Sequence, residues 1–175
     1  MSDIGVLALR LVVGLYLIGH GGQKMFGWFD GPGLRGASGM FTMLGFRPAA
    51  FWAIVAAGGE LAGGLLLVLG FLNPLGELAI AASMAVATLA VHGSKGPWAL
   101  KGGYELPLTD FVVVVALGLI GPGRYSLDAL LSTNLPPILD GLLIVLTVLA
   151  VVVALVTRRP QAAPVVAGAQ RNQTE

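Results

Sequence analysis

Long uninterrupted runs of apolar residues, separated by short polar segments, dominate this chain. Lipid offers no hydrogen-bonding partners, so a backbone that crosses it must be helical or part of a closed barrel. Because the apolar residues are continuous rather than alternating, the pattern predicts helices. Each run is near the roughly 20 residues that cross hydrocarbon, although the third and fourth are short. The five predicted spans are residues 4–23, 51–72, 75–91, 106–120 and 138–156.

Turn-forming residues separate these runs. Asn73 and Pro74 lie between the second and third spans, which are therefore expected to form an antiparallel hairpin. The predicted fold is an all-α membrane protein, a four-helix transmembrane bundle with a fifth, C-terminal transmembrane helix. The predicted division is a four-helix domain over 1–132, the additional helix within 133–157, and a disordered polar cytoplasmic tail over 158–175.

Composition supports a membrane protein. Hydrophobic residues make up 56% of the chain and charged residues only 11%, against about 25% charged residues in soluble domains. The net charge of +1, with no basic cluster, gives no reason to expect nucleic-acid binding. The chain has no cysteine, which excludes disulfides and thiolate metal ligands within it. Asp3 and the absence of Lys or Arg before the first run predict a retained span rather than a cleaved signal.

Basic residues predict the orientation in the membrane. Cytoplasmic loops carry an excess of Lys and Arg. Arg124 is the one cation in the loops on one side. The eight cations on the other side are Lys24, Arg35, Arg47, Lys95, Lys101, Arg158, Arg159 and Arg171. We therefore expect the N-terminus outside and the C-terminus in the cytoplasm.

Two charged residues fall inside predicted spans. Arg10 lies in the first span and Glu60 in the second, and each costs about 2.5–3.5 kcal/mol at the bilayer centre on insertion scales. Both side chains are long, so an interhelical ion pair between them is feasible. Two other interpretations stay open: the pair only fixes helix register, or Arg10 extends to the outer headgroups.

Other ionisable residues gather near the cytoplasmic ends of the spans. His20 and Lys24 are spaced i,i+4 on one helix face. Polar groups in membranes face the bundle interior rather than lipid, which predicts a polar pocket at the cytoplasmic side. Its candidate residues are Arg10, His20, Lys24, Glu60, His92, Glu105 and Asp110.

Several motifs are weaker. The segment GPGLRG at 31–36 matches a dinucleotide fingerprint but lacks the required strand and helix, so we treat it as chance. Gly59 and Gly63 have GxxxG spacing, for which plain helix packing is the favoured interpretation. His20 and His92 are expected at similar depth on two helices, where they could ligate a haem or a metal ion. A pair of interfacial histidines is the preferred interpretation, and no metal site is predicted.

Three segments in order carry a family resemblance. LRLVVGLYLIGHGGQKMFG, GGELAGGLLLVLG and GGYELPLTDFVVVVALGLIGPGRYSLD resemble the DoxX family of small bacterial membrane proteins over residues 9–128. The motif residues are Gly21, Gly63, Gly121, Pro122, Gly123, Arg124, Ser126 and Asp128. By position, the family-like polar residues are Arg10, His20, Lys24, Glu60, Glu105 and Asp128.

The resemblance implies a four-helix bundle in the bacterial plasma membrane and a link to oxidoreductase systems, because a related membrane subunit belongs to a thiosulfate–quinone oxidoreductase. The expected function is an integral membrane subunit or scaffold of a redox complex, with a soluble redox enzyme at its cytoplasmic face. Quinone is the candidate cofactor, and haem is disfavoured. A carrier or conduit for a small solute or proton, as a homo-oligomer, is the alternative.

Overall fold

The computed structural model describes residues 2–159, and every regular element in that range is helical. The fold class predicted from the sequence, an all-α membrane protein, is confirmed. The predicted tail beyond residue 159 lies outside the described residues. The main helices are α1 (Ser2–Phe26), α2 (Gly33–Met43), α3 (Ala49–Leu69), α4 (Leu75–Val86), α5 (Glu105–Ile120), α6 (Leu127–Leu131) and α7 (Pro137–Thr157). The short turns are η1 (Trp28–Asp30), η2 (Ala87–Val91), η3 (Gly93–Lys95) and η4 (Ala99–Lys101).

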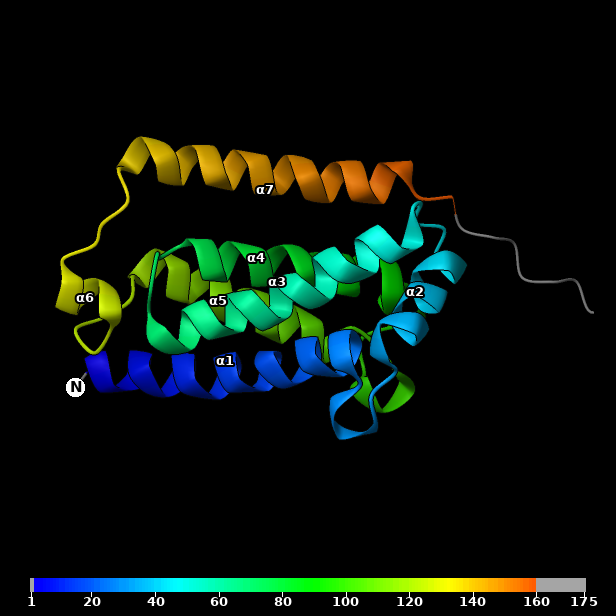
Figure 1. Ribbon diagram of the computed structural model, residues 1–175, viewed down its shortest axis with the longest axis horizontal. Helices are drawn as coiled ribbons and strands as arrows, with labels where there is room; N and C mark the ends of the chain where they lie inside the picture. Colours follow the sequence, from blue (N-terminus) through cyan, green and yellow to red (C-terminus); the bar gives the residue numbers. More distant parts are fainter. Residues whose placement is uncertain (1, 160–175) are drawn as a thin grey trace, which may run out of the picture.

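Four helices form the bundle (Figure 1). α1 packs along α3, α3 along α4, and α4 along α5, whereas α1 touches α5 only marginally. Neighbouring helices of the bundle therefore pack closely in three pairs, and the fourth pair, α1 and α5, packs only weakly. Its interior is a single apolar cluster of Val6, Val13, Leu17, Leu67, Ile80, Ala81, Met84, Val114 and Leu117.

Small residues allow the close helix contacts. A Cβ on Gly14 would lie 2.9 Å from the Gly64 carbonyl oxygen, and one on Gly63 would lie 2.8 Å from the Gly76 carbonyl oxygen. Apolar burial drives helices together in water but not within lipid, where close packing takes its place. The packing interpretation of the GxxxG spacing agrees with these contacts, since Gly63 faces α4.

Among the described residues, three helices, α1, α3 and α7, are long and apolar enough to cross a membrane, and the segment Leu75–Val91 is a shorter apolar helix. α7 lies beside α4, set apart from the bundle in Figure 1, and only 6% of its most apolar window is buried. Its end is attached by a hydrogen bond from the Arg159 amide to the Gly45 carbonyl, at 2.9 Å.

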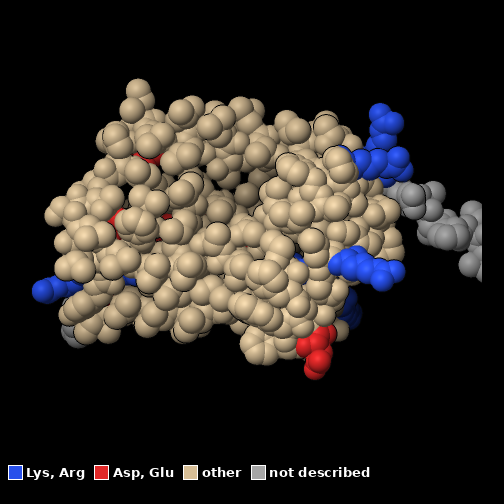
Figure 2. All heavy atoms as spheres, viewed as in Figure 1, with Lys and Arg blue, Asp and Glu red and all other residues tan. Residues whose placement is uncertain are grey.

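α2 was not predicted from the sequence. It covers the end of the bundle where α1 finishes, and its Ala37 and Phe41 join Phe46, Ala53 and Ala154 in a second apolar cluster. We call this the basic end, because it holds the cations Lys24, Arg35, Arg47, Lys95, Lys101, Arg158 and Arg159. The opposite end, where α1 begins, is the amino end. Figure 2 shows Lys and Arg gathered at the basic end and a long, mostly uncharged flank between the two ends.

Candidate functional site

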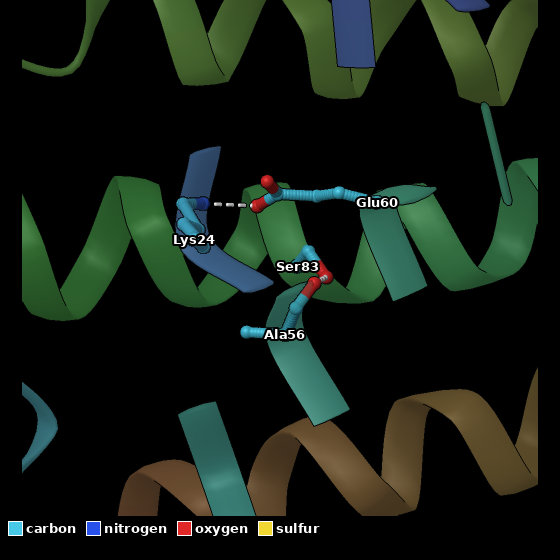
Figure 3. A network of polar contacts seen from close by, with 4 residues as sticks. All are labelled: Lys24, Ala56, Glu60 and Ser83. Atoms are coloured by element: carbon cyan, nitrogen blue, oxygen red, sulfur yellow. Dashed lines mark hydrogen bonds and ion pairs between the residues drawn. The ribbon is translucent and has the colours of Figure 1, made fainter. Parts of the chain in front are cut away.

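One ion pair joins α1 to α3 near the basic end. The Lys24 ammonium donates to Glu60 Oε1 at 2.5 Å, and Glu60 is buried with 1% of its surface exposed. The second oxygen, Glu60 Oε2, is also buried and has no hydrogen-bond partner among the described residues. Figure 3 shows this oxygen turned away from Lys24. Buried carboxylate oxygens are nearly always paired, so a hydrogen-bond donor is expected at this atom.

A glycine brings the two partners within reach. A Cβ on Gly21 would lie 2.6 Å from the Leu61 amide nitrogen and 2.7 Å from the Ala57 carbonyl oxygen. Only a residue without a side chain permits this approach of α1 to α3. Lys24 lies one turn beyond Gly21 on the same face and therefore reaches Glu60.

Lys24 also lines a cavity of about 320 Å³ at the basic end, which we call the vestibule. Its polar side chains are Tyr16, His20, Lys24, His92 and Asp110. The apolar wall is made of Leu17, Met40, Met84, Ala87, Val91, Ala99, Leu106 and Pro107, with Gly102 and Gly103 beside them. A mostly apolar cavity with a few convergent polar groups is typical of small-molecule sites.

The two histidines occupy different settings in the vestibule. His92 Nδ1 lies 2.6 Å from the Gly102 carbonyl oxygen. Because a carbonyl only accepts, Nδ1 carries the proton, and Nε2 of the neutral ring is an acceptor without a partner among the described residues. The His20 ring packs edge-on against Tyr16, with 4.6 Å between centroids.

A π-helical turn, η2, forms part of the vestibule wall through Ala87 and Val91. The His92 amide reaches back five residues to the Ala87 carbonyl at 3.0 Å, where an α-helix would reach back four. The wider turn shifts His92 relative to its place on a regular helix. Such turns occur frequently at functional sites.

The vestibule is lined by both α1 and α5, the two neighbouring helices that pack only weakly against each other. Two of its lining residues, Tyr16 and Leu106, are 52% and 56% exposed on the flank of the molecule.

Arg10 lies elsewhere, and the Arg10–Glu60 pair that the sequence made feasible is not formed. Arg10 is 1% exposed and donates four hydrogen bonds to backbone carbonyls. Two acceptors, Leu67 and Val68, belong to the end of α3, each at 2.8 Å. The others, Pro122 and Tyr125, follow α5 at 2.7 and 2.9 Å. Arg10 thus binds carbonyls at the end of α3 and in the segment after α5, whereas Glu60 pairs with Lys24.

Asp128 completes this structure at the amino end. Its carboxylate accepts from the Leu72 and Asn73 amides at 3.0 and 2.9 Å, and its own amide donates to the Gly70 carbonyl at 3.0 Å. We call Arg10, Gly70 and Asp128, with the carbonyls that Arg10 binds, the Arg10 network. It joins α1, the end of α3 and the segment after α5.

Most of the family-motif residues lie in or beside the Arg10 network. Gly121 ends α5, and Ser126 caps α6 by accepting from the Ala129 amide at 3.1 Å. The Arg124 amide donates to Asp3 at 3.2 Å, and Gly123 faces Val6 of α1. These residues hold the amino end together, and none of them lines the vestibule.

Glu105 is also outside the vestibule. Its carboxylate is exposed and accepts from the Ala99 amide at 2.9 Å, which closes the loop between η4 and α5. Of the seven predicted pocket residues, the structure therefore brings four into one cavity, His20, Lys24, His92 and Asp110, and attaches Glu60 to them through Lys24. Tyr16, one turn before His20, was missed, although its i,i+4 spacing was visible in the sequence.

Two further cavities are almost wholly apolar. The larger, about 410 Å³, lies between α4, α5 and α7, and only Glu77 and Thr147 bring polar groups to its lining. The other, about 170 Å³, lies between α3, α4 and α7 near Trp52. Within residues 2–159, no group of three or more His, Asp or Glu side chains is placed to hold a metal ion. The vestibule is therefore the candidate site.

Over residues 2–159 the chain is an all-helical protein whose long apolar helices contact lipid. It belongs to the DoxX family, whose profile matches residues 5–93, just over half of the chain. The resemblance seen in the sequence is thus confirmed.

Two relatives support this assignment. An uncharacterized membrane protein of Mycobacterium tuberculosis, Rv3486, is 29% identical over 138 residues, which cover 73% of this chain and 81% of that protein. An uncharacterized protein of Haemophilus influenzae is 34% identical over 82 residues, 47% of this chain, so the match spans about half of that relative, 54%. No solved structure matches the chain.

Proposed function

We propose that this protein is a membrane subunit of a redox complex and that its vestibule binds the head group of a quinone-type carrier. The observation that carries the proposal is the chemistry of the vestibule: a small cavity with His20, Lys24, His92 and Asp110 on apolar walls, lined by the weakly packed pair α1 and α5. An amphiphile has a polar head for such a cavity and an apolar tail for the flank outside it. A volume of about 320 Å³ suits a single ring.

Titration of the purified protein with a short-chain ubiquinone or menaquinone tests the proposal. Saturable binding is expected, and His20→Gln is expected to weaken it about tenfold, because one positioned polar contact is worth about 1 kcal/mol or more. Glu105→Gln is the matched control, since Glu105 lies outside the vestibule. Absence of saturable binding to the protein, alone and with a co-purified partner, would end the proposal.

A conduit across the membrane is the less favoured function. Between the vestibule and the Arg10 network the bundle interior holds the apolar cluster around Leu17, Ile80 and Val114, which opposes the passage of a solute or proton, beside the buried carboxylates Glu60 and Glu77. Leu17 and Met84 belong both to that cluster and to the vestibule lining, so they form its floor. Proteoliposomes should therefore show the same solute and proton flux as empty liposomes, and a clear flux would reverse this preference.

The orientation and the partner form part of the proposal. The excess of cations at the basic end favours a cytoplasmic location for that end, in the bacterial plasma membrane. A soluble redox enzyme is proposed to dock there, and crosslinking in native membranes is the test. Because the chain has no cysteine, Ser94→Cys at the basic end and Asn134→Cys at the other provide single labelling sites. An impermeant maleimide added to intact cells should modify only the second.

A further inference from the structure

We infer that the cavity of about 410 Å³ between α4, α5 and α7 binds one acyl chain of a membrane phospholipid. This inference is independent of the proposed function, because the cavity and the vestibule are different sites. The residues that line the cavity fall within 77–85 of α4, 111–119 of α5 and 144–152 of α7. The vestibule instead takes its lining from α1 and from the parts of the bundle nearest the basic end.

The cavity runs along the helices at the depth of the hydrocarbon. Each of the three lining stretches extends over about 12 Å of helix, and each lies within a run predicted to cross the membrane. Glu77 follows the start of α4 and Leu119 lies next to the end of α5, so the cavity belongs to the half of the bundle at the amino end. A bilayer core of about 30 Å leaves about 15 Å to each leaflet. The length of the cavity therefore suits one acyl chain of the leaflet at that end.

The walls of the cavity favour an apolar occupant over water. Only Glu77 and Thr147 bring polar groups to the lining, and the Glu77 carboxylate already accepts from the Asn73 side-chain amide at 3.0 Å. A buried water needs about two to four polar partners, whereas an apolar cavity of about 150 Å³ stays dry and binds benzene. An empty space would also leave the lining atoms without dispersion contacts on one side. A hydrocarbon chain is the molecule of the bilayer that meets these conditions.

The cavity is continuous with the surface of the protein that contacts lipid. Leu119 of α5 and Val148 of α7 both line it, and they are 82% and 56% exposed on the flank of the molecule. The residues at the edge of the cavity are thus themselves part of the lipid-contacting surface. A phospholipid can place a chain there and keep its head group at the membrane surface.

A bound chain supplies a contact that α7 lacks. α7 packs along α4, but no comparable contact joins it to α5 among the described residues. Its other attachments are at the basic end, where Ala154 joins the second apolar cluster and the Arg159 amide donates to the Gly45 carbonyl. Toward the amino end, a chain between α5 and α7 packs against both helices and holds α7 beside the bundle.

Native mass spectrometry of the full chain, released from nanodiscs of phosphatidylcholine and phosphatidylglycerol, tests the inference. The wild type is expected to retain one phospholipid under activation that removes the other lipids. Ala85→Phe should lose this phospholipid, because Ala85 lines the cavity and the new ring fills it. Ala62→Phe is the matched control and should retain it, since Ala62 is exposed on α3 and lines none of the three cavities described above.

A photolabel tests the same point on the wild type, without relying on the folding of Ala85→Phe. The protein is irradiated in the same lipids with a phosphatidylcholine that carries a diazirine on one acyl chain. Bulk lipid reaches exposed residues such as Leu119, but Ala81, which lines the cavity, is only 6% exposed. Adducts at Ala81 are therefore expected only from a chain inside the cavity.

Four outcomes would overturn the inference. They are a wild type that retains no phospholipid, equal retention by the wild type and Ala85→Phe, adducts confined to exposed residues, and an occupant other than a phospholipid. A retained quinone, or a second copy of the chain without lipid, would be such an occupant. None of these outcomes decides the proposed function, which is tested by titration of a quinone into the vestibule.

Discussion

Arg10 gives the clearest prediction about stability. Its side chain donates four hydrogen bonds to carbonyls of Leu67, Val68, Pro122 and Tyr125, at 2.7–2.9 Å. Arg10→Leu leaves all four acceptors without that donor in a buried site. At about 1 kcal/mol for each lost bond, the expected loss is about 4 kcal/mol of unfolding free energy. Because Arg10→Leu also removes a buried charge, and with it the cost of desolvating that charge, the expected loss of unfolding free energy is somewhat smaller.

Arg10→Lys separates the role of charge from that of geometry. An ammonium keeps the positive charge but has three donors and no planar fork. At least one of the four carbonyls then loses its partner, so the expected loss is about 1–3 kcal/mol, between the wild type and Arg10→Leu. A Lys variant as stable as the wild type would show that charge alone matters at this position.

Equilibrium unfolding in mixed detergent micelles, followed by the fluorescence of the three tryptophans, measures these changes. Arg124→Leu is the matched control at the same end, since its side chain is exposed and packs only over the Tyr125 ring at 5.5 Å. It should stay within about 0.5 kcal/mol of the wild type. If Arg10→Leu also stays within that range, the Arg10 network does not stabilise the fold and the argument fails.

The remaining predictions concern helix contacts near the vestibule. Lys24→Met and Glu60→Leu should be non-additive by about 1 kcal/mol or more in a double-mutant cycle, because the two side chains touch; additive effects would show that the ion pair contributes nothing. Arg10→Leu and Glu60→Leu should instead add within about 0.5 kcal/mol, since separate partners hold them, and a larger coupling would restore the pair predicted from the sequence. Gly21→Ala should cost about 1–3 kcal/mol through its contact with α3, whereas Gly141→Ala, with nothing within 4 Å, should be tolerated. Equal melting temperatures for these two glycine variants would contradict the packing argument.

The membrane itself made the spans predictable. A hydrocarbon layer of fixed thickness requires apolar runs of a narrow range of lengths, so the five predicted ranges agree with α1, α3, α4 with η2, α5 and α7 to within a few residues. The second range extended too far, to residue 72. α3 ends at Leu69 because Gly70 adopts a left-handed conformation, with φ +60°. A side chain there would also meet the Arg10 guanidinium.

α2 was missed for a reason of composition. Gly33, Gly36 and Gly39 lower its helix propensity, and Pro32 beside Gly31 and Gly33 favours a turn. The helix is held instead by the burial of Ala37 and Phe41 against α3 and α7. That contact joins segments far apart in the chain, and local propensity carries no information about it.

The site was only partly predictable. Helical spacing correctly placed His20 and Lys24 on one face, and their depth matched that of His92 and Asp110. Depth gave no information about partners, however. From the sequence, Arg10 was paired with Glu60, the other charged residue inside a predicted span. Its partners in the structure are backbone carbonyls, which have no sequence signature. The wall of the vestibule between η2 and the loop before α5 was likewise not predictable, because it is formed by tertiary contacts alone.

Photoaffinity labelling with an azidoquinone tests most directly whether the vestibule is the ligand site. After irradiation of the protein in lipid, digestion and mass spectrometry locate the modified residues. The account predicts labels within residues 16–24 of α1 and 102–110 around the start of α5, reduced by an excess of unlabelled ligand. Labels confined to α7 and the 410 Å³ cavity beside it, or labels that no excess ligand displaces, would contradict it.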